Sequence, residues 1–174
     1  MVAGHEASRR NFPLESPMDL KTSALHEIDA TLRFFEKTVS VLTEDDSTFA
    51  PTPEMMTVAQ HVAHTGMTAD WFRLGGFDGE WDMDFEAGAK KVAAHTSLAG
   101  ALQLMREAFA RLRERTEASN NDELGAAMAD NPILGTLPVY HLFEALVDHT
   151  GHHRGTLAVY ARLRGRVPPM PYMD

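Results

Sequence analysis

The stretch Tyr140–Leu163, YHLFEALVDHTGHHRGTLAVYARL, decides how the rest of the chain is interpreted. It contains no proline, and its apolar residues recur at steps of three and four, which is the period of an amphipathic helix. Between Leu146 and Leu157, two imidazoles, His149 and His153, occupy places on the apolar stripe where leucines would be expected. Residues four apart lie one above the other on a helix, close enough to bind one metal ion.

A histidine pair at this spacing is weak evidence alone, because hydrogen-bonded structural pairs are the more frequent explanation. Here both imidazoles fall on a stripe expected to be buried, where an unpartnered ring nitrogen is costly. A second cluster, His61 and His64, lies far upstream in VAQHVAHT. We therefore expect the two stretches to meet around a metal ion.

Composition limits the ligands that such a site can use. The chain has no cysteine among its 174 residues, so any metal must be bound by histidine, carboxylate or water. Hydrophobic residues make up 44% and charged residues 24%, which is typical of one soluble globular domain. The net charge of −9 disfavours nucleic acid as a partner.

No apolar run approaches the roughly 20 residues needed to span a bilayer. Arg9 and Arg10 resemble a twin-arginine export signal, but proline and charged residues follow where an apolar region would be required. We expect a cytoplasmic protein with no membrane partner, in which residues 1–17 form a flexible leader and residues 18–174 a single domain.

Four long helices account for most of that domain. The cleanest stripe lies in residues 18–42, with steps of three and four from Leu25 to Leu42. A second helix is predicted over 57–73 with Thr57 as its N-cap, and a third over 97–119 with Ser97 as its N-cap. Pro138 is predicted to lie in the first turn of the fourth. Two long links, with short helical turns expected at 85–89 and 122–128, indicate an all-α four-helix bundle with long crossover connections.

Three neutral imidazoles and water would form an open coordination sphere of the catalytic type. A metalloprotease motif is excluded, because Thr150 stands where the glutamate after the first histidine is required. A di-iron site is excluded as well, since no glutamate has a histidine three residues later.

Two elements together resemble the DinB-like superfamily, the DNA-damage-inducible and YfiT-like four-helix bundles. They are TVAQHVAH, from Thr57 to His64, and His149-x-x-x-His153 followed by Arg154 and Gly155. The resemblance implies a divalent ion, nickel or zinc, held by His64, His149 and His153. This chain departs from the family pattern at two positions, with Met56 where tryptophan is common and Thr156 where glutamine is common.

The resemblance also implies a function. The superfamily includes metal-dependent transferases and isomerases that use small thiols such as bacillithiol, mycothiol or glutathione, and its members commonly form homodimers. On this basis we expect thiol transfer to a small-molecule substrate, with Arg154 binding a carboxylate of the thiol. The alternatives are a non-catalytic or stress-linked metal-binding module, a metal-dependent hydrolase, or a bundle with a histidine network and no metal.

Several histidines keep open roles. His152 can replace His153 as a ligand by spacing alone, and His61 fits either a pocket wall or the surface. His141, eight residues before His149, fits a pocket or the rim of the core. The candidates for contacts that orient the ligand imidazoles are Trp71, Tyr140, Glu144 and Asp148.

Overall fold

The computed structural model describes residues 19–173, so the predicted leader over residues 1–17 lies outside the described part of the chain. Its helices in chain order are α1 (Leu20–Val39), α2 (Val58–Arg73), α3 (Phe85–Ala93), α4 (Leu98–Glu117), α5 (Asn121–Gly125) and α6 (His141–Leu163). A short 3-10 turn, η1 (Glu44–Asp46), precedes α2, and a π-helical turn, η2 (Leu74–Asp78), follows it. No helix in this part of the chain is both long and apolar enough to cross a membrane.

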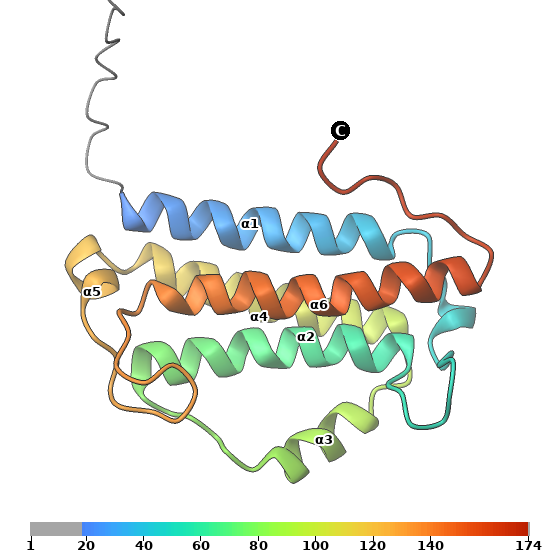
Figure 1. The fold of residues 1–174 in the computed structure, drawn as a ribbon, viewed down its shortest axis with the longest axis horizontal. Helices are drawn as coiled ribbons and strands as arrows, with labels where there is room; N and C mark the ends of the chain where they lie inside the picture. Colours follow the sequence, from blue (N-terminus) through green and yellow to red (C-terminus); the bar gives the residue numbers. More distant parts are fainter. Residues whose placement is uncertain (1–18, 174) are drawn as a thin grey trace, which may run out of the picture.

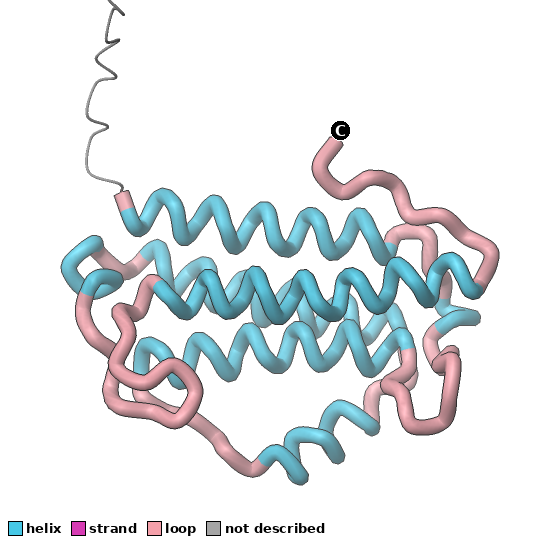
Figure 2. The backbone as a smooth tube through the Cα atoms, in the orientation of Figure 1, coloured by secondary structure: helices cyan, strands magenta, loops and turns pink. Residues whose placement is uncertain are grey.

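The four long helices α1, α2, α4 and α6 lie side by side as a bundle (Figure 1). Helices α1 and α6 run in one direction, and α2 and α4 run in the other. Because α2 and α4 are parallel, the chain must return along the length of the bundle between them, and α3 lies on that return path (Figure 1). The link between α4 and α6 instead stays at one end (Figure 2). The predicted all-α four-helix bundle is confirmed, with its crossover between α2 and α4.

Side-chain caps set the helix starts that the sequence predicted. Thr57 accepts a hydrogen bond from the amide of Gln60, whose side chain accepts one from the Thr57 amide at 2.9 Å. Ser97 caps α4 by accepting from the amide of Gly100. The fourth helix begins at His141 and not at Pro138, because Pro138 pairs with Ala127 in an isolated antiparallel bridge, and the Val139 amide donates to the carbonyl of Ala126. The carbonyl of Pro138 accepts from the His141 amide in the turn that leads into the helix.

The core confirms the predicted stripes and shows where helices approach most closely. On α1, Ile28, Phe35 and Val39 are buried, as expected from their spacing. Gly66 on α2 lies against α4, and a Cβ added there would be 2.6 Å from the Cα of Met105. This glycine is therefore required for the α2–α4 distance, because no side chain fits between the two backbones.

The C-terminal tail is fastened to the bundle, whereas the sequence predicted only an extended segment. Asp46 is fully buried and accepts hydrogen bonds from Arg164 and Arg166. Burial raises the pKa of Asp46, but hydrogen bonds from the backbone and hydroxyl of Thr43, together with those from the two arginines, lower it to about 2. Further along, Tyr172 packs edge-on against Phe34 of α1 with ring centroids 5.0 Å apart.

Candidate metal centre

Three histidines from two helices converge inside the bundle. His64 lies in the middle of α2, and His149 and His153 lie one turn apart on α6. The Nε2 atom of His149 is 3.2 Å from the Nε2 of His64 and 3.2 Å from the Nε2 of His153. One ring nitrogen from each of the three lies within 4.8 Å of the other two. The sequence-predicted ligand set is therefore brought together.

The spacing of these nitrogens fits a bound metal better than a hydrogen-bonded network. A neutral ring nitrogen has either one N–H or one lone pair, so the Nε2 of His149 cannot make two good hydrogen bonds at once. Two nitrogens on a metal at about 2.05 Å are about 2.9 Å apart at a right angle and about 3.4 Å apart in a tetrahedron. The two separations of 3.2 Å from the Nε2 of His149 fall between these values. The residues present fit a divalent metal ion.

Burial keeps these imidazoles neutral, as metal ligands must be. Desolvation, reinforced by the neighbouring imidazoles, lowers the pKa of His153 to about 2 and the pKa of His149 to about 4. Burial also lowers the pKa of His64. Since a protonated imidazole cannot bind a metal, these lowered pKa values leave all three rings able to bind one at neutral pH.

A fourth histidine supports one of the three. His61 is buried, and its Nδ1 lies 2.9 Å from the Nδ1 of His153. With the Nε2 of His153 free to face a metal, its proton is on Nδ1, so His153 donates and His61 accepts. His61 then carries its own proton on Nε2, a buried atom with no hydrogen-bond partner in the described structure. Its ring packs edge-on against Tyr160, with centroids 5.3 Å apart.

Sequence reasoning left His61 as a pocket wall or a surface residue, and the structure shows neither. A signal was present in the spacing: His61 and His64, three apart on α2, present two rings on one face, as His149 and His153 do on α6. Two facing pairs of imidazoles predict four interacting rings rather than three.

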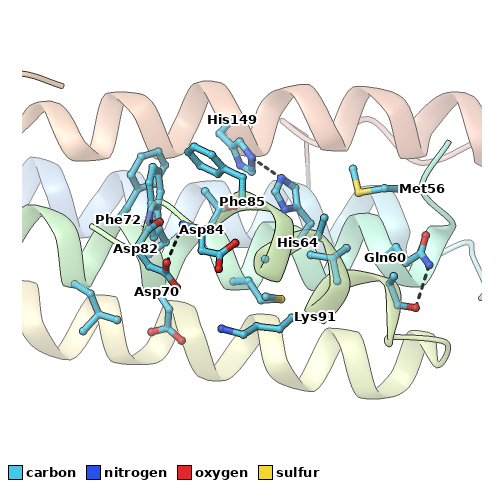
Figure 3. A pocket seen from close by; sticks show the side chains of 18 residues that line it. Met56, Gln60, His64, Asp70, Phe72, Asp82, Asp84, Phe85, Lys91 and His149 are labelled. Atoms are coloured by element: carbon cyan, nitrogen blue, oxygen red, sulfur yellow. Dashed lines mark hydrogen bonds between the residues drawn. The ribbon is translucent and has the colours of Figure 1, made fainter. Parts of the chain in front are cut away.

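A cavity of about 740 Å³ opens beside the histidines (Figure 3). It lies between α2 and α3, and His64 and His149 line it, whereas His153 and His61 do not. The open coordination positions of a bound metal would therefore face the cavity, with His153 and His61 behind. Most of the remaining lining is apolar, and it includes Trp71, Phe72 and Phe85. Among the lining residues, Lys91 is the one lysine or arginine.

The other histidines weighed in the sequence lie outside the cluster. His152 is exposed, with its ring edge-on to that of His153, and it is not one of the converging three. His141 is at the first position of α6, where its Nδ1 lies 2.7 Å from a carboxylate oxygen of Glu144, and it does not line the cavity.

Arg154, predicted to bind a thiol carboxylate, is directed away from the cavity lining. Its Nη2 donates to the hydroxyl of Tyr172 at 2.9 Å, and its guanidinium lies 5.8 Å from the ring centroid of Phe34. One further nitrogen, Nη1, is buried and has no hydrogen-bond partner in the described structure. The role of Arg154 in binding a thiol stays a prediction.

The residues considered for orienting the ligands have other partners. The Trp71 indole donates to the carbonyl of Asp82, and the Tyr140 hydroxyl donates to Glu27. Glu144 pairs with His141, and Asp148 is exposed. In the described residues, a side-chain contact that orients one of the three converging rings comes instead from His61, which contacts His153.

The fold and the three converging histidines define a class: a four-helix bundle with an open, all-histidine centre between α2 and α6. The family model of the DinB superfamily matches residues 27–157, which is well over half of the chain and includes all three histidines. The protein belongs to the DinB superfamily, as the two motifs predicted. No match was found among curated proteins.

Proposed function

We propose that this protein binds one divalent metal ion, nickel or zinc, through His64, His149 and His153, and that it is a transferase for a small thiol. The observation that supports it most is the convergence of three neutral imidazoles on one point beside a cavity of substrate size. A metal held there would lower the pKa of a bound thiol and so supply a thiolate near neutral pH.

The surrounding residues divide the remaining work. His61 holds His153 in the tautomer that presents Nε2. A substrate bound in the cavity between α2 and α3 would displace water from the face where His64 and His149 lie, and the cavity walls would orient it. Thiol transfer is favoured over simple metal storage because a storage site needs no adjoining cavity of this volume.

Elemental analysis of the native protein beside a His149→Ala/His153→Ala variant tests the metal. About one nickel or zinc per chain is expected in the native protein and none in the variant. At a free metal concentration 100 times Kd, binding adds about 2.7 kcal/mol, or a rise of roughly 5–10 °C in Tm for a chain of this size. A native protein that takes up neither ion would overturn the proposal.

Activity is tested by following the loss of glutathione thiol with 1-chloro-2,4-dinitrobenzene, with and without the metal. Turnover that depends on the metal and is lost in the double variant supports a transferase. Metal uptake without turnover on any of several thiols would favour the non-catalytic module instead.

We also propose that the protein is a homodimer. The exposed side of α6 carries Val147, Val159 and Leu163, which are large apolar residues facing solvent in the single chain. Light scattering after size exclusion is expected to give twice the 19.3 kDa chain mass. A cytoplasmic location stays a prediction.

A further inference from the structure

The cavity beside the histidines is walled by aromatic rings from two helices that the sequence alone does not place together. Trp71 and Phe72 come from α2, and Phe85 is the first residue of α3. The Trp71 ring is 4.7 Å from that of Trp81 and 6.3 Å from that of Phe85, centroid to centroid. Rings of this kind bind other rings through edge and face contacts.

Glycine makes this wall possible. A Cβ on Gly75 would lie 2.3 Å from the ring of Trp81, so only glycine lets Trp81 fold back onto Trp71. Gly75 lies in the π-helical turn η2 at the end of α2, where an extra residue per turn redirects the chain toward α3. The aromatic wall of the cavity is therefore positioned by specific residues of the crossover between α2 and α4.

The polar groups of the lining are mostly engaged within the protein. Asp70 forms ion pairs with Arg73 and Arg111. Gln60 bonds to the backbone of Thr57 and of Ala93 at its two ends. Lys91 is a lining cation for which the described residues show no ion pair. Beyond it, a ligand in the cavity meets few free hydrogen-bonding groups, which disfavours a sugar-like or peptide-like body, because its own polar groups would lose water without replacement.

Apolar side chains are exposed at the mouth of the cavity, where a bound ligand would cover them. Phe85 lines the cavity although 62% of its surface is exposed, and the neighbouring Met83 is 39% exposed. Burying such surface against a second apolar body is favourable in proportion to the area removed from water. The volume of about 740 Å³ lies within the range of drug-sized binding sites.

We propose that this cavity binds an uncharged, ring-bearing apolar molecule, and that this molecule is the electrophile to which a thiol is transferred. Its ring packs against the cavity-facing sides of Phe85 and Trp71, which contact each other edge-on, with its reacting atom toward His64 and His149. The thiolate sulfur forms a bond to an electrophilic carbon of this molecule, the bond from that carbon to its leaving group (a halide, for example) breaks, the leaving group departs as an anion, and the thiol proton goes to solvent. The assignment as a substrate rests on the transferase function proposed above, whereas the binding itself does not require a metal.

Of the two tryptophans in the chain, Trp71 lines the cavity and Trp81 packs against Trp71, so intrinsic fluorescence reports on occupancy. We would titrate the metal-free full chain with nitrobenzene, an uncharged aromatic quencher, and in parallel with nitromethane, which carries the same quenching group without the ring. Nitrobenzene is expected to quench with saturation, as a bound ligand does, and nitromethane only in linear, collisional fashion.

A matched pair of variants locates the ring. Phe85→Ala should raise the nitrobenzene Kd by about fivefold or more. Met170→Ala removes a side chain of similar exposure, 58%, in the C-terminal tail away from the cavity lining and should leave the Kd unchanged. Circular dichroism of both variants checks that their helix content is that of the native chain.

The proposal would be overturned if nitrobenzene quenched only linearly, or if its Kd rose equally in the two variants. Because these titrations omit metal, such a failure leaves the metal site and thiol chemistry untouched. Conversely, saturable binding in a protein that takes up no nickel or zinc would retain the cavity as an apolar binding site and remove only its assignment to transfer.

Discussion

Helix α2 has two packed faces that do different work. Toward α4 its backbone approaches so closely that Gly66 has no space for a Cβ. Toward α6 it presents His61 and His64, whose rings meet other rings through nitrogens that are incompletely hydrogen bonded. The face toward α4 stabilises the bundle through close van der Waals contacts. The face toward α6 carries ring nitrogens that can bind a ligand. One helix thus separates the contacts that hold the bundle from the groups that can bind a ligand.

The largest expected effect is a difference in stability between the same substitution made at two glycines. Gly66→Ala forces a Cβ against the backbone of Met105 and is expected to destabilise the protein by about 1–3 kcal/mol. Gly155→Ala on the exposed side of α6 meets no atom within 4 Å and should stabilise by up to about 1 kcal/mol. Urea unfolding followed by circular dichroism measures both, and effects of the same sign would contradict the close-packed role of Gly66.

Lowering the pH should destabilise the packing of α2 against α6, where the histidines lie, more than its packing against α4. His61 and His149 titrate near pH 6.5 when unfolded, but burial, reinforced by neighbouring imidazoles, lowers their pKa to about 4 when folded. The unfolded chain therefore binds protons first, and stability is lost as pH falls from about 6.5 toward about 4. The Tm of the metal-free protein should fall over this window.

The His149→Ala/His153→Ala variant provides the control for this pH effect. It removes two of the titrating rings, so its Tm should vary less steeply between pH 6.5 and 5. Parallel Tm profiles of the native protein and the variant would show that the buried imidazoles do not set the acid sensitivity.

His61 is expected to act on the metal only through His153. His61→Phe keeps a buried ring against Tyr160 but removes the acceptor for the His153 N–H, and it should weaken metal binding by about 10- to 100-fold. His61→Asn restores an acceptor oxygen near the position of Nδ1 and should recover much of that loss. Calorimetric titration with zinc measures the affinities, and a native Kd in the Phe variant would rule out the positioning role.

Local rules in the sequence were sufficient for the bundle, because its helices obey them independently. The stripe ending at Leu42 and the caps Thr57 and Ser97 each depend on residues within one helix, and each prediction is confirmed. The spacing on one helix indicated a histidine pair that includes His149, but it left His152 and His153 as alternatives, and the family resemblance favoured His153. The choice of His64 as a ligand rested on the family resemblance, because the sequence of α2 alone does not indicate which histidine ring faces α6.

The cavity could not be predicted, because its walls come from tertiary contacts. The segment after Gly75 has no hydrophobic period, so neither the fold of Trp81 onto Trp71 nor the length of α3 was visible in it. The helix was expected over 85–89 and extends from Phe85 to Ala93. Its covering position follows from the parallel run of α2 and α4, a property of the whole bundle.

The smallest expected effect is a change in KM that distinguishes two cations, Lys91 and Arg154, as the group that binds a carboxylate of the thiol. Lys91 lines the cavity, whereas Arg154 is held by Tyr172 and Phe34 on the side of α6 that faces α1. If the carboxylate binds in the cavity, Lys91→Gln should raise KM for glutathione a few-fold with little change in kcat, since one exposed ion pair contributes about 0.2–1 kcal/mol. Arg154→Gln should then alter Tm through the lost contact with Tyr172 and leave KM unchanged. The reverse result, a raised KM for Arg154→Gln alone, would mean that the tail at Tyr172 moves aside for the thiol and that the thiol approaches the histidines from the α1 side, not through the aromatic cavity.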